Sequence, residues 1–307
     1  MALVAPALAE PLESAVDFHV DPGGAEANLA SHLAALGRRA AWAGAVGDDA
    51  LGRRIVTRIA ERGVDTRWVE TDPGAPTGVY FKDPGQGVTY YRNGSAASRL
   101  GPDFVAGLPL AGTRVVHLSG ITPALSASCD ALVDALIDAA RAAAACVSFD
   151  VNHRPALWSS TDAAARRLLE LAARADVVFV GRDEAEVLWG TATADDVRAV
   201  LPEPAHLVVK DGAVGATEFG THGTAHAPAL RVELVEAVGA GDAFAAGWLG
   251  AWLAGSGEHG SAEADPGAAA VQRLRAGHER AVLVLADTAD FPRPQRGAAI
   301  PARGDRT

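Results

Sequence analysis

The chain has 307 residues, which is enough for one large α/β domain or two small ones with a sizeable core. Its formal net charge of −11 argues against nucleic acid as the main partner. The two cysteines have no metal-type spacing, and the apolar runs are too short to cross a bilayer. We therefore expect a cytoplasmic protein of a reducing compartment, with no disulfide framework and no membrane partner.

Strand-like apolar runs alternate with helical runs along most of the chain. We expect strands at residues 40–46, 115–118, 146–150, 177–180 and 207–210, and helices at 51–62, 129–145, 161–174 and from 241 onward. This alternation predicts right-handed βαβ units and a mostly parallel sheet with helices on both faces.

Residues 65–98 break this rhythm with turn signals and short alternating runs. The runs at 79–82 and 88–92 are typical of two antiparallel strands. A small sheet inserted in an α/β domain is a candidate lid over a site, and the alternative is a β-hairpin without function. A polar loop is expected at 255–267, and the proline-, glycine- and arginine-rich tail at 292–307 is expected to be flexible.

The most informative run is residues 238–244, where small residues precede Asp242 and an uncharged stretch follows as far as Gly255. This pattern predicts a tight loop entering a buried helix, whose unpaired backbone N–H groups attract anions. An aspartate there would repel the anion, unless it accepts a proton from a hydroxyl that attacks a phosphate. The run therefore indicates phosphoryl transfer, although a plain turn with Asp242 as helix cap remains the alternative. Phe244 replaces the third glycine of a dinucleotide loop, and no P-loop run occurs.

Two signatures give the chain a family resemblance. One comprises Gly239, Ala240, Gly241, Asp242, Ala246 and Gly247, and the other comprises residues 23–28 (Gly-Gly-Ala-Glu-Ala-Asn) with Ala30, Gly37 and Gly47. From about residue 17 to 285 the chain resembles the ribokinase-like (PfkB) carbohydrate kinases, and most resembles their 2-keto-3-deoxygluconate kinase branch. The resemblance implies a three-layer α/β/α fold with a mostly parallel central sheet. It also implies one domain over residues 1–290, with a β lid at about 65–98 plus part of 10–22, and a flexible tail at 291–307.

The resemblance also implies the chemistry and the cofactors, ATP and Mg²⁺. Asp242 would accept the proton of a primary alcohol, while the backbone of Gly239, Ala240 and Gly241 would stabilise the transferred phosphoryl group. The sugar would be bound by Gly23, Gly24, Asn28, Tyr80, Tyr90, Arg92, Ile121 and Arg154. The nucleotide would be bound by Asn152, Lys210 and Gly212 together with Gly239 and Gly241, and Glu184 would hold the metal through water.

Several of these residues also have a plainer interpretation. Gly23-Gly24 suits a simple helix-entry turn, and Lys210-Asp211-Gly212 suits a surface β-turn with a solvated lysine. Arg154 follows a strand end, where α/β sheets bind ligands, and is suited to a bidentate pair with a substrate carboxylate. The alternative for Arg154 is an ion pair with a structural acid.

The chain departs from the family pattern at three places, and a fourth position leaves two candidate acids. The family begins with a strand ending in Gly-Glu or Gly-Asp, and residues 1–4 resemble the run after it, so a late start codon or a sheet without this strand is expected. Gly181 stands in the asparagine position of an Asn-x-x-Glu motif, and Glu236-Ala237 replaces Asp-Thr. Asp287 and Asp290 both align with a family acid, and the sequence does not choose between them.

The sequence thus predicts an ATP-dependent sugar-acid kinase that forms 2-keto-3-deoxy-6-phosphogluconate. Arg92, Arg154 and the tyrosines favour an acid over a neutral sugar such as fructose or ribose, because two guanidinium groups in one pocket attract a carboxylate. A non-catalytic sugar-binding protein on the same fold is the alternative from another class. We also expect a homo-oligomer formed through the lid, with Tyr80 and Tyr90 partly shielded by a partner.

Overall fold

The computed structural model describes residues 1–8, 10–221, 223–255, 265–287 and 289–291. The predicted tail and most of the predicted 255–267 loop lie outside these residues. The strands are β1 (Ala2–Pro6), β2 (Phe18–Pro22), β3 (Ala41–Gly47), β4 (Asp65–Asp72), β5 (Val79–Asp83), β6 (Gly87–Tyr91), β7 (Val115–Ser119), β8 (Cys146–Asp150), β9 (Val177–Gly181), β10 (His206–Asp211), β11 (Gly215–Gly220) and β12 (Gly223–Pro228). The helices are α1 (Ala25–Ala35), α2 (Ala50–Glu61), α3 (Ala127–Ala142), α4 (Thr161–Ala173), α5 (Arg182–Trp189), α6 (Ala194–Val200), α7 (Ala240–Gly255) and α8 (Pro266–Leu285).

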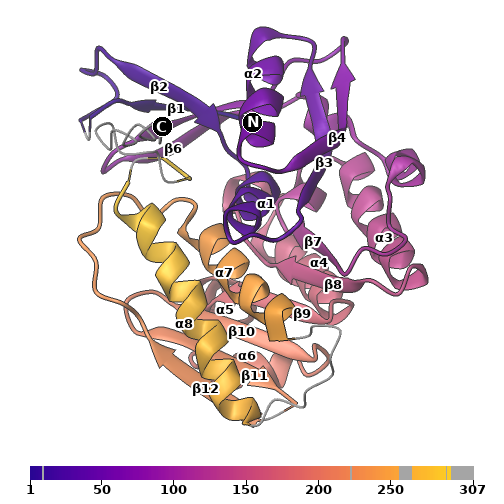
Figure 1. Ribbon diagram of the computed structural model, residues 1–307, viewed down its shortest axis with the longest axis vertical. Helices are drawn as coiled ribbons and strands as arrows, with labels where there is room; N and C mark the ends of the chain where they lie inside the picture. The colour runs from indigo at the N-terminus through magenta and orange to yellow at the C-terminus, as the bar shows by residue number, and fades with distance from the viewer. Residues whose placement is uncertain (9, 222, 256–264, 288, 292–307) are drawn as a thin grey trace, which may run out of the picture.

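A six-stranded sheet with the order β12-β11-β10-β9-β8-β7 forms the centre of the body (Figure 1). Strands β7 to β10 are parallel, and β11 and β12 add an antiparallel edge. The β9 segment is buried along its whole length, as expected for a strand covered on both faces. The predicted strands and helices of this region are confirmed, with ends that differ by a few residues.

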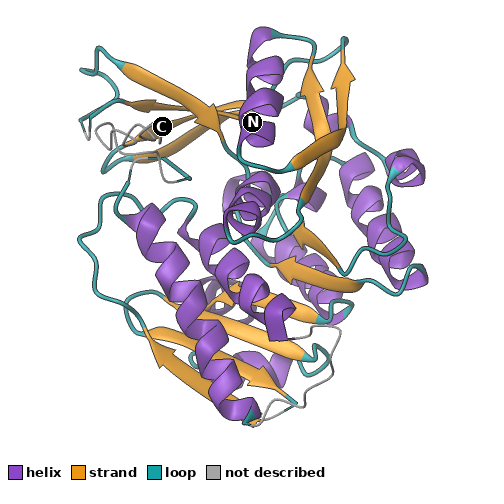
Figure 2. Cartoon of the chain, viewed as in Figure 1, coloured by secondary structure: helices purple, strands orange, loops and turns teal. Residues whose placement is uncertain are grey.

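Side chains alternate between the two faces of the sheet and thereby build two cores. Val178 and Val180 pack with α3, α4 and α5 on one face. Val177 and Phe179 pack with α1, α7 and α8 on the other. This arrangement gives the predicted three layers, visible with helices on both sides of the strands in Figure 2. Ser126 and Ser160 cap the starts of α3 and α4. The hydroxyl oxygen of each serine accepts a hydrogen bond from the backbone N–H group three residues later, which would otherwise be unpaired.

A second, four-stranded sheet with the order β2-β1-β5-β6 lies over one end of the body (Figure 1). The predicted antiparallel pair at 79–82 and 88–92 is confirmed as β5 and β6. The lid bounds differ from the expected 65–98, because β4 pairs in parallel with β3 and lies outside this sheet. Strand β1 belongs to the lid sheet, where it pairs with both β2 and β5.

The β3–β4 pair is separate from the six-stranded sheet. Among the described residues, no strand pairs with β3 on the side away from β4, or with β7 on the side away from β8. The sheet is therefore interrupted between β3 and β7, in agreement with the expectation that residues 1–4 do not supply a central strand. No helix of the described residues is long and apolar enough to cross a membrane.

Helices α7 and α8 lie close together at Gly247. A Cβ atom there would lie 2.3 Å from the carbonyl oxygen of Ala276 and 2.9 Å from the Cα of Gly277. Both neighbours are backbone atoms, so relief requires the helices to move apart. Helix α7 carries Asp242 in its first turn, and this close contact therefore fixes the position of the expected base.

We expect Gly247→Ala to destabilise the fold by about 1–3 kcal/mol through overpacking. For a chain of this size that corresponds to a decrease in Tm of about 2–6 °C, measured by thermal unfolding. Gly107→Ala is the matched control, because a Cβ atom there meets nothing within 4 Å. Equal Tm values for the two variants would contradict the close helix contact.

Candidate active site

One cavity of about 2010 Å³ runs between the lid, helix α1, the free edges of β3 and β7, and the first turn of α7. All the residues predicted from the sequence to bind or act line it: Gly23, Gly24, Asn28, Tyr80, Tyr90, Arg92, Ile121, Asn152, Arg154, Glu184, Lys210, Gly212, Gly239, Ala240, Gly241 and Asp242. They come from opposite ends of the chain and from both sheets, so the fold brings them together around one space.

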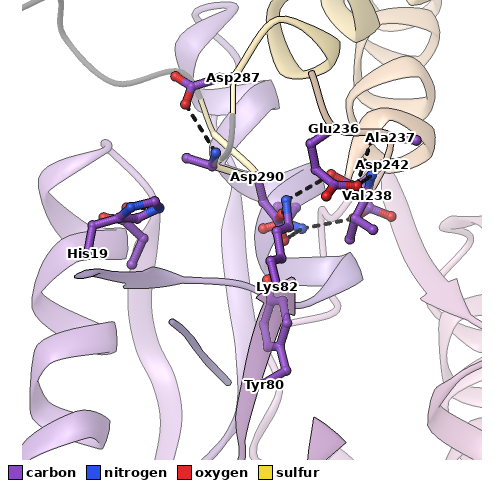
Figure 3. Close-up of polar contacts among 12 residues, drawn as sticks. His19, Tyr80, Lys82, Glu236, Ala237, Val238, Asp242, Asp287 and Asp290 are labelled. Carbon is purple, nitrogen blue, oxygen red and sulfur yellow. Dashed lines mark hydrogen bonds and ion pairs between the residues drawn. The ribbon is translucent and has the colours of Figure 1, made fainter. Parts of the chain in front are cut away.

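The loop before α7 presents unpaired backbone donors to this cavity. Gly239 has φ 91°, a conformation that favours glycine, and it turns the chain into the helix. Within the described residues, no acceptor occurs for the N–H groups of Gly239, Gly241 and Asp242, as expected at a helix start. The carboxylate of Glu236 accepts hydrogen bonds from the two following N–H groups at 2.8 and 3.1 Å, so it shapes the entry to the loop (Figure 3).

Asp242 is not a helix cap in this structure. Its Oδ2 atom accepts a hydrogen bond of 2.9 Å from Nδ2 of Asn28, and among the described residues it accepts none from a backbone N–H group. Burial raises the pKa of Asp242 to about 8, with further upward contributions from Asp150 and Asp290, while Asn28 and Lys210 oppose the shift. A carboxylate held near neutral pKa is suited to proton transfer.

Asp290 completes the surroundings of Asp242, and of the two acids that the sequence left open it is the one that lines the cavity. The Oδ2 atom of Asp290 accepts hydrogen bonds from Nδ2 of Asn28 at 3.1 Å and from the hydroxyl of Tyr80. Its Oδ1 atom pairs with Nζ of Lys82 at 2.6 Å. Asp287 instead accepts a hydrogen bond from the N–H of Ala289 at 3.1 Å, and it does not line the cavity.

The backbone of Asp290 is held by His32. The Nε of Arg280 donates to Nδ1 of His32 at 2.8 Å, so the proton of the neutral ring lies on Nε2, which contacts the carbonyl oxygen of Asp290 at 3.2 Å. Burial, reinforced by Arg280, lowers the pKa of His32 to about 3, so the ring stays neutral at physiological pH. This support could not be predicted from the sequence, because a lone histidine on a helix belongs to no motif.

The part of the cavity that was predicted to bind the sugar contains polar atoms without partners among the described residues. A Cβ atom at Gly23 would lie 1.8 Å from the Tyr80 hydroxyl, so only glycine fits there. Asn28 is 2 % exposed, and its Oδ1 atom has no hydrogen-bond partner among the described residues. An acceptor in this state is suited to a ligand hydroxyl.

Arg92 is the second incompletely satisfied group. Its side chain is 8 % exposed, its guanidinium group lies 4.3 Å from the ring centre of Tyr90, and its Nε atom is without a partner among the described residues. Within the described part of the chain no carboxylate lies at ion-pair distance from it, and Glu26 acts on it only from farther away. Buried charges are normally paired, so this guanidinium group points to an anionic ligand.

The other predicted cation, Arg154, has a partner. Its Nη1 atom donates to the carbonyl oxygen of His153 at 3.0 Å and lies 3.9 Å from a carboxylate oxygen of Glu184. This loose pair supports the structural interpretation of Arg154 without removing the group from the cavity. Glu184 accepts hydrogen bonds from the N–H groups of His153 and Gly181, at 3.0 and 2.8 Å, and so joins the start of α5 to the loop after β8.

Lys210 is not a solvated lysine on a surface turn. Its Nζ atom lies 2.9 and 3.2 Å from the two carboxylate oxygens of Asp150, and a Cβ atom at Gly241 would lie 3.4 Å from it. Burial lowers the pKa of Lys210, but Asp150 and Glu184 outweigh this effect and raise it. The ammonium group thus remains charged beside the anion-binding loop. Gly212 lines the same cavity, and Asn152 has φ 41° at the end of β8.

Comparison with known proteins agrees with this geometry. The family model described as pfkB family carbohydrate kinase matches residues 1–287. The chain belongs to the pfkB family. It is 37 % identical to a 2-dehydro-3-deoxygluconokinase of Thermoproteus tenax over 80 % of this chain and 77 % of that protein.

Other relatives of this carbohydrate kinase carry a different substrate name. The chain is 31 % identical to probable fructokinase-3 of Arabidopsis thaliana over 76 % of this chain and 69 % of that protein. A crystal structure of a PfkB protein from Polaromonas sp. JS666 superposes with a TM-score of 0.80 at 33 % identity, covering 92 % of each chain. The ribokinase-like fold and the kinase class are thereby confirmed, and the sugar is not fixed by these likenesses.

The raised pKa of Asp242 predicts a pH-dependent stability. An unfolded aspartate titrates near pH 4, so between about pH 4 and 8 the folded protein keeps a proton that the unfolded chain has released. Unfolding then releases a proton, and stability decreases as pH rises through this window.

We therefore expect Asp242→Asn to have a higher Tm than the wild type at pH 8, with a difference that shrinks toward pH 5. One pKa unit corresponds to about 1.4 kcal/mol, or about 3 °C for a chain of this size. Scanning calorimetry from pH 5 to 9 measures the difference, with the exposed Asp103→Asn as control. A difference that is constant with pH would contradict the burial argument.

Proposed function

We propose that this carbohydrate kinase transfers the γ-phosphoryl group of ATP to the primary hydroxyl of 2-keto-3-deoxygluconate. The buried guanidinium group of Arg92, with no acid partner among the described residues, is the observation that carries the proposal. It lies in the same cavity as the Asp242 loop, so a substrate with a carboxylate at one end would place its other end at the base. The name of the Thermoproteus tenax relative agrees with this substrate class.

The proposed reaction is an in-line displacement at phosphorus. The substrate hydroxyl donates its proton to Asp242 as its oxygen bonds to the γ-phosphorus, and the bond to the leaving ADP oxygen breaks. The backbone N–H groups of Gly239 and Gly241 donate to the oxygens of the transferred group. Asn28 orients the acid through its amide hydrogen and offers its free oxygen to the sugar.

The acids of the site fit Mg²⁺, which in kinase sites keeps several waters and takes one or two carboxylates with the phosphates. Asp150 and Glu184 lie around Lys210, whose pKa both raise, and this position supports the proposal that Glu184 would hold the ion through water. The ion would neutralise charge on the phosphates. The protein groups supply the rest of the arrangement: Lys210 beside the loop, and Asp242 opposite the sugar.

A kinase for a neutral sugar is the second candidate, favoured by the fructokinase relatives. A non-catalytic sugar-binding protein would not need the proposed base Asp242 and its loop.

The homo-oligomer through the lid stays a prediction, but its expected effect on Tyr80 is corrected. This side chain is 2 % exposed within a single chain, so it needs no partner to cover it.

Release of ADP from Mg·ATP, measured with 2-keto-3-deoxygluconate, gluconate, fructose and ribose, tests the substrate. We expect a strong preference for the keto-deoxy acid.

Asp242→Asn is expected to lower kcat by about 10²–10⁴-fold, because a general base contributes this much. Its affinity for the sugar, measured by calorimetry, is expected to change little. Near-normal turnover of this variant would show that Asp242 is not the base.

Arg92→Met tests the carboxylate-binding role. We expect kcat/KM for the keto-deoxy acid to fall about 10–100-fold, mainly through KM, since a hydrogen bond to a charged group contributes about 1.5–3 kcal/mol. Turnover of fructose should change much less. Arg53→Met is the control, because Arg53 pairs with Asp48 on the surface and does not line the cavity. Equal losses on acid and neutral sugars would assign Arg92 a structural role.

A further inference from the structure

Strand β5 of the lid sends two buried side chains to Asp290. Tyr80 and Lys82 are two residues apart, so they lie on the same face of the strand, and they are 2 % and 1 % exposed. The Lys82 ammonium group pairs with one oxygen of Asp290, and the Tyr80 hydroxyl donates to the other. Asp290 is itself 2 % exposed, so this contact is withdrawn from solvent.

Asp290 and Asp242 share one donor. The amide nitrogen of Asn28 has two hydrogens, and it donates to Oδ2 of Asp242 at 2.9 Å and to Oδ2 of Asp290 at 3.1 Å. Two carboxylates held on one amide group cannot both be ionised without a compensating positive charge. Lys82 supplies that charge on the far side of Asp290.

Lys82 also contacts the catalytic loop. Its Nζ atom donates to the carbonyl oxygen of Val238 at 3.3 Å, and Val238 directly precedes the loop that opens α7 (Figure 3). We propose that Lys82 is a positioning residue: it fixes the lid strand against the loop before Asp242 and neutralises the second carboxylate that shares Asn28 with the base. The proposal rests on the proposed role of Asp242 as base.

The presence of lysine and not arginine at position 82 supports a role that depends on the compact shape of the ammonium group. The chain has 27 basic residues, yet only Lys82 and Lys210 are lysines. Each is ion-paired with a buried acid that lines the cavity, Asp290 and Asp150 respectively. An exposed position accepts either cation, whereas the compact ammonium group fits a closed space that excludes the planar guanidinium group.

Other charged groups also act on Asp242 and Asp290, and they are the same in the wild type and in the Lys82 variants. Asp242 faces Asp150 from β8 and Lys210 from β10, besides Asn28 and Tyr80. Asp290 faces the amino group of Met1 and the guanidinium group of Arg62, as well as its two lid partners. Lys82 differs from these cations because it comes from the lid and bonds directly to the carboxylate. Its compensating charge is therefore in place only when the lid lies in the position seen here.

The first test needs no activity. The Tm difference between the parent and Asp242→Asn is measured against pH, and the pH at which it levels off reports the titration of Asp242 in the folded protein. We expect the levelling-off to move up by about one pH unit when Lys82→Met is added. Lys82→Met/Asp290→Asn should bring it back to the wild-type pH or below, because the second carboxylate is gone. Arg53→Met should leave it unchanged.

The second test is the pH profile of kcat/KM with the best sugar of the panel. Lys82→Met should move the acidic limb up by about one pH unit, so that activity at pH 7 falls about tenfold and recovers above pH 9. The double variant should regain the wild-type limb. If Lys82→Met does not fold, Lys82→Met/Asp290→Asn is compared with Asp290→Asn. The acidic limbs of their kcat/KM profiles should then lie at the same pH.

Either test can overturn the proposal. A Lys82→Met variant that loses Tm or activity equally at every pH, with both titrations unchanged, would leave Lys82 a purely structural lysine. Different limbs for Asp290→Asn and the double variant would also contradict it. If the wild type turns over none of the four sugars, the proposed substrates fail, while the stability titration still decides the role of Lys82.

Discussion

The site depends on keeping several carboxylates close together at the wall of one cavity. Asp150, Asp242 and Asp290 all line one cavity, and like charges at this range oppose ionisation. Each acid has its own compensation: Lys210 binds Asp150, Lys82 binds Asp290, and Asp242 receives a neutral amide hydrogen. Asp242, the proposed base, is thus the acid without a cation in direct contact, and burial raises its pKa. An acid compensated by a full positive charge would be a poor proton acceptor.

This distribution of charge requires distant parts of the chain. Asp150 and Lys210 lie at the carboxyl ends of β8 and β10, where parallel sheets bind ligands. Asp242 enters from the first turn of α7, and Lys82 from a separate sheet. The close α7–α8 contact supports the helix that carries Asp242. The hydrogen bond from His32 holds the backbone of Asp290. Movement of the lid relative to the body would therefore alter the charge balance around the base as well as access to the sugar.

The parts of the site that lie in short contiguous runs were predictable from the sequence. The 239–242 loop and the 23–28 run each combine a turn, a helix start and a polar side chain, and the structure places both in the cavity. Lys82 was not predictable, because it stands in an ordinary alternating strand and acquires its partner from residue 290. Asp287 and Asp290 are equivalent by spacing, and only the position of the segment after α8 distinguishes them. Likewise, β4 has the alternation of a lid strand, but its parallel pairing with β3 depends on a contact that no local pattern specifies.

The proposed substrate preference follows from the same charge distribution. A site that already holds several acids repels a second anion besides the phosphates, unless a cation is reserved for it. Lys82 and Lys210 are both occupied by protein carboxylates, and Arg154 is loosely engaged by Glu184. Arg92 is the buried cation whose guanidinium group forms no ion pair with the described residues, and it lies on the lid side of the cavity, with its guanidinium group stacked on Tyr90. A neutral sugar would leave this guanidinium group desolvated and uncompensated, whereas a sugar acid would pair with it. The cost of leaving a buried charge unpaired is thus the physical reason for proposing an acid as the substrate.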